Sequence, residues 1–231
     1  MGCAYTDADI YYYREKILEH LGFNFDQELA LNTALLYDYL KPYQLWSHRK
    51  WIYDHLPEGQ THDETTFITN MLEKDRRNFH TWTFSSWYAD KFNKHDWLFA
   101  ITTSQITDDP FNNGAWSMRY NLLSKMNMKP GDDLEFSLNQ LQQFPLSQSC
   151  ASYIKGILDL DFSLAAKVKS SLDEIISKNP EFVPPLILAS QIAHKEGDMA
   201  LYDKYIDQLK NADSMRSHFW SLMKSSSKRF S

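Results

Sequence analysis

The chain has 231 residues, of which 43% are hydrophobic and 15% aromatic, and a formal net charge of −6. A chain of this size and composition can bury a core of its own, which argues against disorder. Its acidic balance argues against general nucleic-acid binding, which needs a basic surface. Only 7 glycines and 8 prolines interrupt it, too few for the frequent turns of an all-β protein. Composition therefore favours a helical, globular protein.

Cysteine usage and hydropathy predict a cytoplasmic protein with no membrane partner. Cys3 and Cys150 cannot form a disulfide framework, and neither belongs to a Cys-x-x-Cys pair. No apolar run approaches the roughly 20 residues that cross a bilayer, and no secretory leader is visible. The opening Met1–Thr6 fits the N-myristoylation pattern, with Cys3 as a second acylation position, but no other segment points to a membrane.

A tryptophan-centred segment recurs along the chain. Trp46, Trp82 and Trp116 each follow a short polar stretch and open a helical pattern, at intervals of 36 and 34 residues. A step of about 35 residues leads back to Tyr11 and forward to Ala151, so five copies of one unit cover most of the first 160 residues.

A second helical pattern separates the tryptophan segments. Residues 26–40, residues 63–75 and the segment that follows Pro130 place apolar side chains at mostly three- to four-residue spacing, as amphipathic helices do. Each unit is thus a helical hairpin of about 35 residues, and stacked hairpins form an α-solenoid.

The C-terminal part departs from this rhythm but remains helical in pattern. Residues 163–178, 186–196 and 198–210 predict three further helices. The sequence therefore predicts one all-α domain over residues 1–231. Its fold would be a right-handed superhelical α-solenoid of about five hairpins, with capping helices over residues 163–224.

The residues of the repeat carry a family resemblance. Tyr43, Gln44, Trp46, His48 and Arg49 form a Tyr-Gln-x-Trp-x-His-Arg unit that resembles the repeat of protein prenyltransferase α subunits. Three later segments resemble the same repeat in order: Asn78 to Trp82, Asn112 to Tyr120, and Tyr153 to Leu158. The Lys-x-Tyr-Gln and Tyr-x-Lys-Gly-Ile-Leu motifs are similar to the α subunit shared by farnesyltransferase and type I geranylgeranyltransferase.

Several positions depart from the family pattern. Phe84 and Ser85 replace His-Arg in the third unit, Tyr11 replaces Trp in the first, and Ala151 replaces Trp in the fifth. An alanine in a tryptophan position loses about 3–5 kcal/mol of burial unless neighbouring side chains fill the space. The tetratricopeptide pattern is not met, because Trp46 is followed by Ser-His-Arg.

The resemblance implies an enzyme that is active only as a heterodimer with a prenyltransferase β subunit. The pair would transfer a farnesyl or geranylgeranyl group from its diphosphate to the cysteine four residues from the end of a target protein, the CaaX peptide. The resemblance also implies zinc in the β subunit and magnesium in the holoenzyme. This chain has no His-Glu-x-x-His motif or cysteine cluster, so we expect no metal site in it.

Two alternatives remain open at this point. The first is a non-catalytic helical-repeat scaffold that binds another protein, as tetratricopeptide proteins do. The second is the α subunit of the Rab-specific geranylgeranyltransferase.

Lys41 and His80 are the candidate catalytic residues. Lys41 lies just before a helix N-terminus, where a cation gains nothing from the helix dipole. Its residue type alone favours a solvated surface lysine, whereas the resemblance implies that it stabilises charge on the leaving diphosphate. His80 occupies the repeat position of Gln44 one unit later. By resemblance it is a second group near the diphosphate, and a packing or capping histidine is the alternative.

Gln44, Tyr43 and Asn78 are the candidate substrate-binding residues. An amide can donate to a carboxylate without adding charge, and by resemblance Gln44 holds the C-terminal carboxylate of the peptide. Tyr43 matches the family tyrosine beside it, and Asn78 would orient the loop of His80.

The remaining motif residues are predicted to be structural. Trp46, Trp82 and Trp116 would pack between hairpins. Arg49 and Arg119, about one turn further on, would pair with acidic residues or helix ends of the neighbouring unit, because a buried charge needs a partner.

Overall fold

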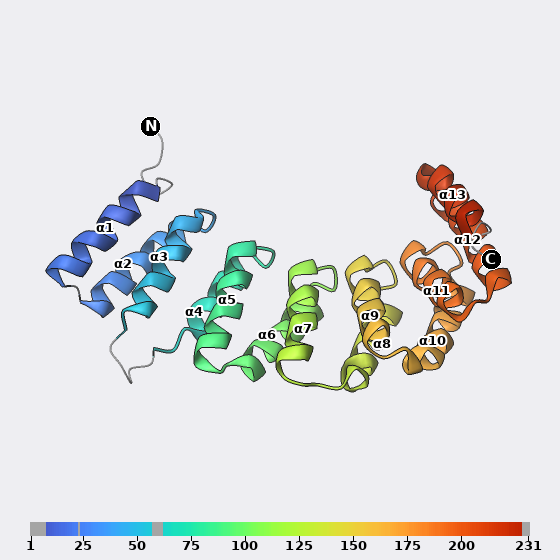
Figure 1. Ribbon diagram of the computed structural model, residues 1–231, viewed down its shortest axis with the longest axis horizontal. Coiled ribbons are helices and arrows are strands. Elements are labelled where there is room, and N and C mark those ends of the chain that lie inside the picture. Colours follow the sequence, from blue (N-terminus) through green and yellow to red (C-terminus); the bar gives the residue numbers. More distant parts are fainter. Residues whose placement is uncertain (1–7, 23, 57–61, 228–231) are drawn as a thin grey trace. The chain divides into compact units, whose positions relative to one another are not determined.

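The computed structural model describes residues 8–22, 24–56 and 62–227. Within these ranges the chain is all-α, with thirteen α-helices and no β-strand (Figure 1). The chain divides into two compact units, Met1–Thr102 and Thr103–Ser231.

Two predictions made from the sequence stay predictions. The N-myristoylation pattern at Met1–Thr6 lies outside the described residues. The single repeat domain over residues 1–231 stays a prediction.

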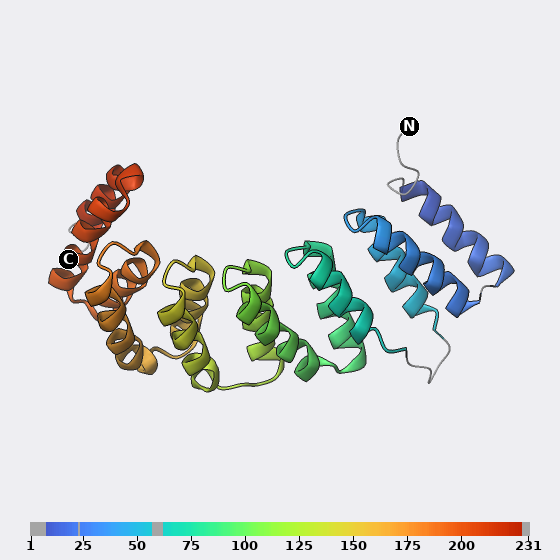
Figure 2. The ribbon, with the colours of Figure 1, turned by 180° about the vertical axis from the view of Figure 1, so that it is seen from behind.

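The first unit stacks tryptophan helices side by side. α3 packs against α1, α2 and α5, and α4 packs against α5 (Figures 1 and 2). The helices are α1 (Ala8–Leu21), α2 (Phe25–Asp38), α3 (Tyr43–Asp54), α4 (Thr65–Lys74), α5 (Phe79–Phe92) and the first part of α6 (His95–Asp108).

The second unit repeats the arrangement. α9 packs against α7, α8 and α11, and α11 packs against α10 and α12. Its helices are α7 (Asn113–Lys125), α8 (Leu134–Gln143), α9 (Gln148–Leu160), α10 (Ala165–Lys178), α11 (Val183–Glu196), α12 (Met199–Ala212) and α13 (Ser217–Ser227). The predicted helical-hairpin solenoid is confirmed.

Each tryptophan helix begins at the same point of the repeat. Four residues before the tryptophan position, Asn78, Asn112 and Ser147 act as N-caps, and their side-chain oxygens accept from backbone N–H groups three residues later at 3.0–3.2 Å. These bonds satisfy donors that the helix itself leaves unpaired. In α3 the cap position is Pro42, which offers no side-chain hydrogen bond.

The tryptophan side chains make hydrogen bonds to the loops that lead into their own helices. Each indole Nε1 donates to the carbonyl six residues earlier at 2.9 Å: Trp46 to Leu40, Trp82 to Arg76, and Trp116 to Pro110. All three rings are buried. The tryptophans therefore both fill the core and stabilise the loops by hydrogen bonding.

The fifth unit compensates for its missing tryptophan. Ala151 is buried, and the ring of its neighbour Tyr153 packs on Trp116 with ring centroids 5.0 Å apart. The Ser147 hydroxyl donates to the Pro110 carbonyl at 2.7 Å. The fifth unit is thus anchored to the same carbonyl as the tryptophan of the fourth.

The repeat continues one step further than the sequence indicated. α11 has its N-cap at Phe182, and the buried Leu186 stands 35 residues after Ala151. Phe182 cannot cap with its side chain, and the unit carries neither tryptophan nor arginine. Because these motif residues are absent, the repeat register of α11 can be recognised only from the boundaries of the helix.

Three hairpins each contain one arginine–carboxylate pair, of which the Arg49 and Arg119 pairs are buried and the Arg14 pair is partly exposed. The guanidinium groups of Arg14, Arg49 and Arg119 make bidentate hydrogen bonds of 2.6–2.8 Å to Glu28, Glu64 and Asp133, which follow 14 or 15 residues later. Each acid comes from the second helical segment of the same hairpin, so the acidic partners of Arg49 and Arg119 lie in their own hairpin and not, as predicted, in the neighbouring unit. Bidentate geometry satisfies both charges, without which burying them would be very unfavourable.

In two of the three pairs, a side chain from the next hairpin makes a further hydrogen bond to the carboxylate. Two positions after the tryptophan position, His48 Nε2 lies 2.7 Å from Glu28 Oε1, and the Tyr153 hydroxyl donates to Asp133 Oδ2. Burial and the carboxylate of Asp133 together raise the pKa of Tyr153, so that its hydroxyl keeps its proton. Glu28 and Asp133 thus join two successive hairpins, whereas the further hydrogen bond to the Glu64 carboxylate comes from Tyr53 of the same hairpin.

Units that lack the arginine also lack the acid. Ser85 occupies the arginine position of the third unit, and the apolar Phe99 and Ala100 stand 14 and 15 residues later, where the acid would be. In the fifth unit Ile154 and Val168 take the two places. Charge is therefore kept or lost as a pair.

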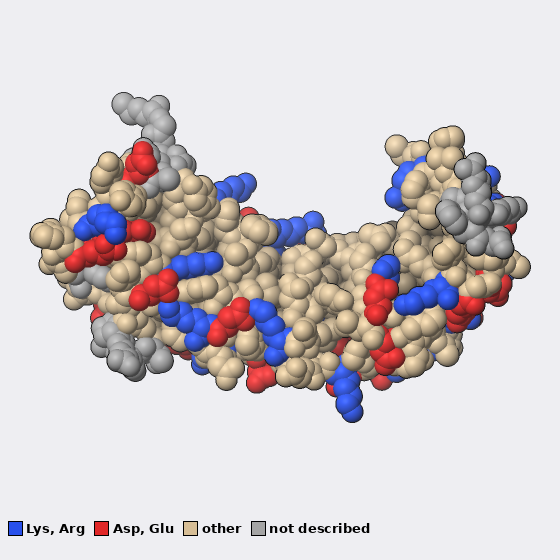
Figure 3. All heavy atoms as spheres, viewed as in Figure 1, with Lys and Arg blue, Asp and Glu red and all other residues tan. Residues whose placement is uncertain are grey.

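Exposed ion pairs are numerous but energetically minor. On the face seen in Figure 3, acidic and basic side chains lie interspersed on both units. A typical case joins Lys91 Nζ to Asp54 Oδ1 at 2.5 Å, and such exposed pairs contribute about 0–1 kcal/mol. The buried pairs are the ones that determine stability.

We expect Arg119→Leu to destabilise the protein by about 3–5 kcal/mol, because it leaves the Asp133 carboxylate buried without its cation. The double variant Arg119→Leu/Asp133→Leu should be markedly more stable than the single variant, since it removes both charges as the fifth unit does. Urea unfolding followed by tryptophan fluorescence measures both. Lys178→Leu, which breaks an exposed pair with Glu174, is the control. A double variant less stable than the single one would contradict this account.

The Glu28 pair predicts a stability that depends on pH. Burial alone would raise the pKa of Glu28, but hydrogen bonds and charges of His48 and Arg14 lower it to about 2, from an ordinary value of 4.5. A depressed pKa stabilises the fold while the carboxylate is ionised, and this contribution is lost as the pH falls from about 5 toward about 2. Over that range the free energy of unfolding should fall less steeply in Glu28→Gln than in the wild type. The exposed Glu135→Gln should leave the slope unchanged.

Candidate functional site

The predicted site residues lie on the first turns of two neighbouring helices. Lys41 is exposed and immediately precedes Pro42, and Tyr43 and Gln44 are the first two residues of α3. His80 is the second residue of α5, in the position that Gln44 has in α3. Because α3 and α5 pack as equivalent helices of successive hairpins, these first turns lie at the same end of the first unit.

Asn78 joins the two first turns. Its side-chain oxygen accepts from the Thr81 backbone N–H at 3.0 Å and caps α5. Its side-chain nitrogen donates to the Leu40 carbonyl at 3.4 Å, the same carbonyl that accepts from the Trp46 indole. Leu40 precedes Lys41, so Asn78 connects the start of α5 to the loop that carries the candidate catalytic lysine. Asn78 is itself buried.

The start of α3 is suited to an anion. The first N–H groups of a helix have no intrahelical acceptor and carry the positive end of the helix dipole. Asn78 caps α5, whereas α3 has Pro42 at this position and no side-chain cap. Lys41 adds a positive charge next to this end. An uncapped helix start beside a lysine can stabilise a phosphate or carboxylate group.

Sequence reasoning missed one basic residue of this site. Arg77 stands five positions before Trp82, as Lys41 does before Trp46. The same position holds Phe111 and Leu146 in the next two units. Basic residues at this repeat position therefore mark the starts of α3 and α5, and the repeat spacing was the signal that could have identified Arg77.

Aromatic rings stand beside these charges. Tyr43 and Phe79, the first residues of α3 and α5, are 54% and 74% exposed. The Phe79 and His80 rings meet edge to face, with centroids 5.8 Å apart. Exposed aromatic side chains next to cations fit a ligand that has both an anionic and an apolar part.

Other chemistry-bearing groups do not take part in this site. Cys150 is buried in α9, and burial raises the pKa of its thiol. Across the described ranges, no group of three or more His, Cys, Asp or Glu residues is arranged to hold a metal ion. In the same ranges no helix has the length and apolar character that a membrane span requires.

The fold and this site together define a helical-repeat protein built of tryptophan hairpins. A family model described as the protein prenyltransferase alpha subunit repeat matches residues 25–56. This segment includes Lys41, Tyr43 and Gln44 and the pair partner Glu28. Over these residues the chain is similar to the repeat of protein prenyltransferase alpha subunits.

Its similarity to individual relatives extends beyond that one repeat. The geranylgeranyl transferase type-2 subunit alpha of Saccharomyces cerevisiae is 30% identical over 191 residues, which is 71% of this chain and 56% of the yeast protein. The human protein of that name is 31% identical over 118 residues, 50% of this chain and 21% of the human protein. The chain thus spans about half the length of the yeast relative and about a fifth of the human one.

The solved structures show the same fold. A chain of the Candida albicans protein geranylgeranyltransferase-I complexed with GGPP superimposes with a TM-score of 0.86 at 23% identity. The match covers 97% of this chain and 80% of that one.

We expect Asn78→Asp to separate the two contacts of Asn78. Aspartate keeps an acceptor for the Thr81 N–H but loses the donor to the Leu40 carbonyl. Hydrogen exchange should accelerate at the start of α3 while α5 stays protected. Asn112→Asp, at the cap of α7, is the matched control and should leave α3 unaffected. Unchanged exchange at α3 in Asn78→Asp would show that the Leu40 contact does not hold the loop.

Proposed function

We propose that the chain is the α subunit of a heterodimeric protein prenyltransferase, which transfers a farnesyl or geranylgeranyl group to a cysteine of a CaaX protein. The observation that carries the proposal is the uncapped start of α3 beside Lys41, inside the segment that matches the family repeat. A β subunit would supply the catalytic zinc and the isoprenoid pocket, and magnesium would accompany the diphosphate. The complex would work in the cytoplasm.

The chain's own residues would act on the diphosphate and on the end of the peptide. Lys41 and the first N–H groups of α3 would stabilise the negative charge that develops on the leaving diphosphate. His80, one repeat away, would donate a second hydrogen bond to it. Asn78 would hold both turns at a constant separation through the Leu40 carbonyl.

Gln44 and Tyr43 would position the acceptor. The Gln44 amide would donate to the terminal carboxylate of the peptide and thereby set the distance to the reactive cysteine. The exposed ring of Tyr43 would cover the adjoining apolar part of the substrate.

A second candidate is the α subunit of a type-2 enzyme, which acts on Rab proteins. It is favoured by the similarity of this chain, at 30–34% identity, to the type-2 alpha subunits of yeast, human and rat. The two candidates differ in the β subunit that the chain binds. A non-catalytic scaffold would bind neither.

Co-expression with type-1 and with type-2 β subunits decides among these candidates. The first proposal expects a stable heterodimer with the farnesyltransferase or type-1 β subunit, and transfer of a labelled isoprenoid to a CaaX peptide. A heterodimer with the type-2 β subunit alone would support the second candidate. No heterodimer with any of them would reject both and leave the scaffold.

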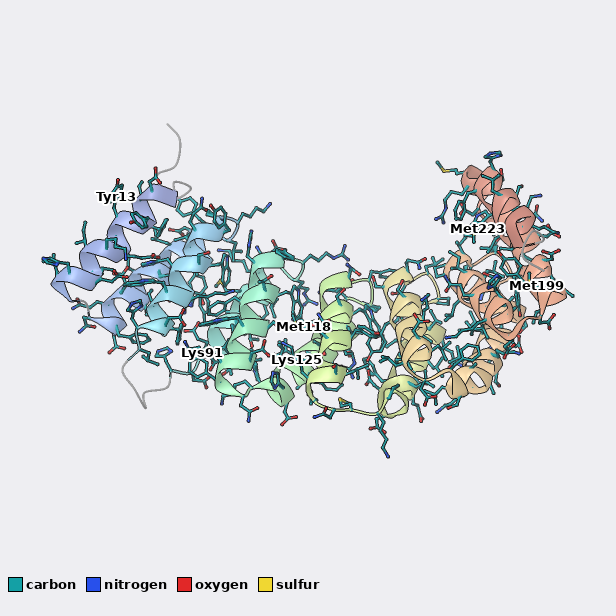
Figure 4. All side chains as sticks on the ribbon, viewed as in Figure 1. Tyr13, Lys91, Met118, Lys125, Met199 and Met223 are labelled. Carbon is teal, nitrogen blue, oxygen red and sulfur yellow. The ribbon has the colours of Figure 1, made fainter. Side chains whose placement is uncertain are left out.

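Within the active heterodimer, Lys41→Ala should slow the single-turnover chemical step by about 10- to 100-fold, because it removes a charge that acts mainly in the transition state. Assembly with the β subunit should be unaffected. Lys125→Ala, an exposed lysine near the end of α7 (Figure 4), is the control. An unchanged single-turnover rate in Lys41→Ala would remove Lys41 from the mechanism.

A further inference from the structure

The outward face of α1 carries side chains that are buried elsewhere in the repeat. Ile10, Tyr13 and Ile17 are 44%, 65% and 56% exposed, although two of them are aliphatic. They stand one position before, two after and six after the buried Tyr11, which occupies the tryptophan position. The stripe is continuous, because residues three and four apart lie on one side of a helix.

The same three positions are covered in the helices that have a preceding hairpin in their own unit. None of the corresponding side chains of α3, α5 and α9 is more than 3% exposed: Leu45, His48, Ile52, Thr81, Phe84, Tyr88, Cys150, Tyr153 and Ile157. This is the face with which a tryptophan helix meets the hairpin before it. On α1 it has no covering helix among the described residues, and α1 lies at the edge of the first unit (Figures 1 and 2).

The middle position of this face has a specific chemistry. In α3, His48 at this position reaches the Glu28 carboxylate of the preceding hairpin at 2.7 Å. In α9, Tyr153 donates its hydroxyl to the Asp133 carboxylate of the preceding hairpin. Tyr13 is the residue at this position of α1, and it projects from the N-terminal half of that helix (Figure 4). Its hydroxyl can make the same bond.

We propose that Ile10, Tyr13 and Ile17 form a docking face for an amphipathic helix of a partner protein, seated as the second helix of a preceding hairpin would be. Ile10 and Ile17 would pack on the apolar stripe of that helix, and the Tyr13 hydroxyl would donate to a buried Asp or Glu on it. As in the three pairs of this chain, an arginine of the partner would hold that carboxylate.

The chemistry of the face favours this occupant over a second copy. Two copies that met through Ile10, Tyr13 and Ile17 would bring two tyrosine hydroxyls together, and the neighbouring carboxylate, Asp9, is exposed rather than buried. A helix that lacks an acid would leave the hydroxyl buried without its acceptor, which is unfavourable for any buried polar group. The proposal does not depend on the transferase activity, because it concerns α1 and not the starts of α3 and α5.

The experiment adds a hairpin of known sequence before α1 by covalent fusion. A copy of residues 8–42 replaces residues 1–7, so that it runs directly into Ala8 of the rest of the chain. This segment of 35 residues keeps the repeat register, because Trp46 and Tyr11 are also 35 residues apart. The copy of Glu28, held by the copy of Arg14, should then meet Tyr13. The probe is thus a hairpin of known sequence.

We expect amide exchange in the original α1 to slow by at least about tenfold in the fusion, since helix ends and exposed helices open far more readily than packed ones. Ile17→Asp should abolish this protection. Tyr13→Phe should reduce it in the fusion but leave the unfused chain unchanged. The matched control is Tyr12, whose repeat position is exposed in every unit, as at Ser47, Thr83, Ser117 and Ser152. Tyr12→Phe should have no effect in either protein.

Three results would overturn the proposal. Equal exchange of α1 in the fused and unfused chains would show that the face does not accept a hairpin. If α1 is protected from amide exchange as fully in the Tyr13→Phe fusion as in the original fusion, the carboxylate takes no part in recognising this face. Concentration-dependent dimerisation of the unfused chain, abolished by Ile17→Asp in sedimentation experiments, would assign the face to a second copy. None of these measurements needs a β subunit or an isoprenoid, so they are independent of the proposed function.

Discussion

The buried arginine–carboxylate pair is the interaction on which the rest of the repeat depends. A guanidinium and a carboxylate can be removed from water only if each satisfies the other and the remaining hydrogen-bonding positions are filled. In this chain the arginine comes from the tryptophan helix, the acid from the second segment of the same hairpin, and a third partner such as His48 or Tyr153 from the next hairpin. One cluster thereby fixes the register within a hairpin and between two hairpins. This explains why the third and fifth units exchange both charges for uncharged residues at once.

The candidate site uses the same scaffold and differs from it at few positions. The tryptophan helices α3 and α5 each have their N-cap four residues before the tryptophan, so their first turns are presented alike. Asn78 keeps them together by donating to the carbonyl that Trp46 already uses. Against that regular background Pro42 removes the cap of α3, and Lys41 and Arg77 add charge where later units have Phe111 and Leu146. The structural repeat thus provides constant geometry, and the departures from it provide the chemistry.

The face with which tryptophan helices meet a preceding hairpin is exposed on α1. In α3 and α9 the residue two positions after the tryptophan position is buried against a carboxylate of the preceding hairpin. Tyr13 has the same place and a suitable hydroxyl but lies 65% exposed. A repeat face that is left to water is expected to be polar, whereas Ile10 and Ile17 make this one apolar.

The sequence by itself determined the helical class, the 35-residue period and the positions of Lys41, Gln44 and His80 in that period, because tryptophan spacing and helical periodicity are local patterns. It also indicated that Arg49 and Arg119 need acidic partners. Only the tertiary structure decided which acids these are, since Glu64 and Asp133 become partners through the antiparallel packing of two helices. It likewise decided that Asn78 reaches the Leu40 carbonyl, 38 residues earlier, and that α11 continues the repeat without its motif residues. Contacts between distant residues depend on how helices pack, and a single sequence carries no local signal for that.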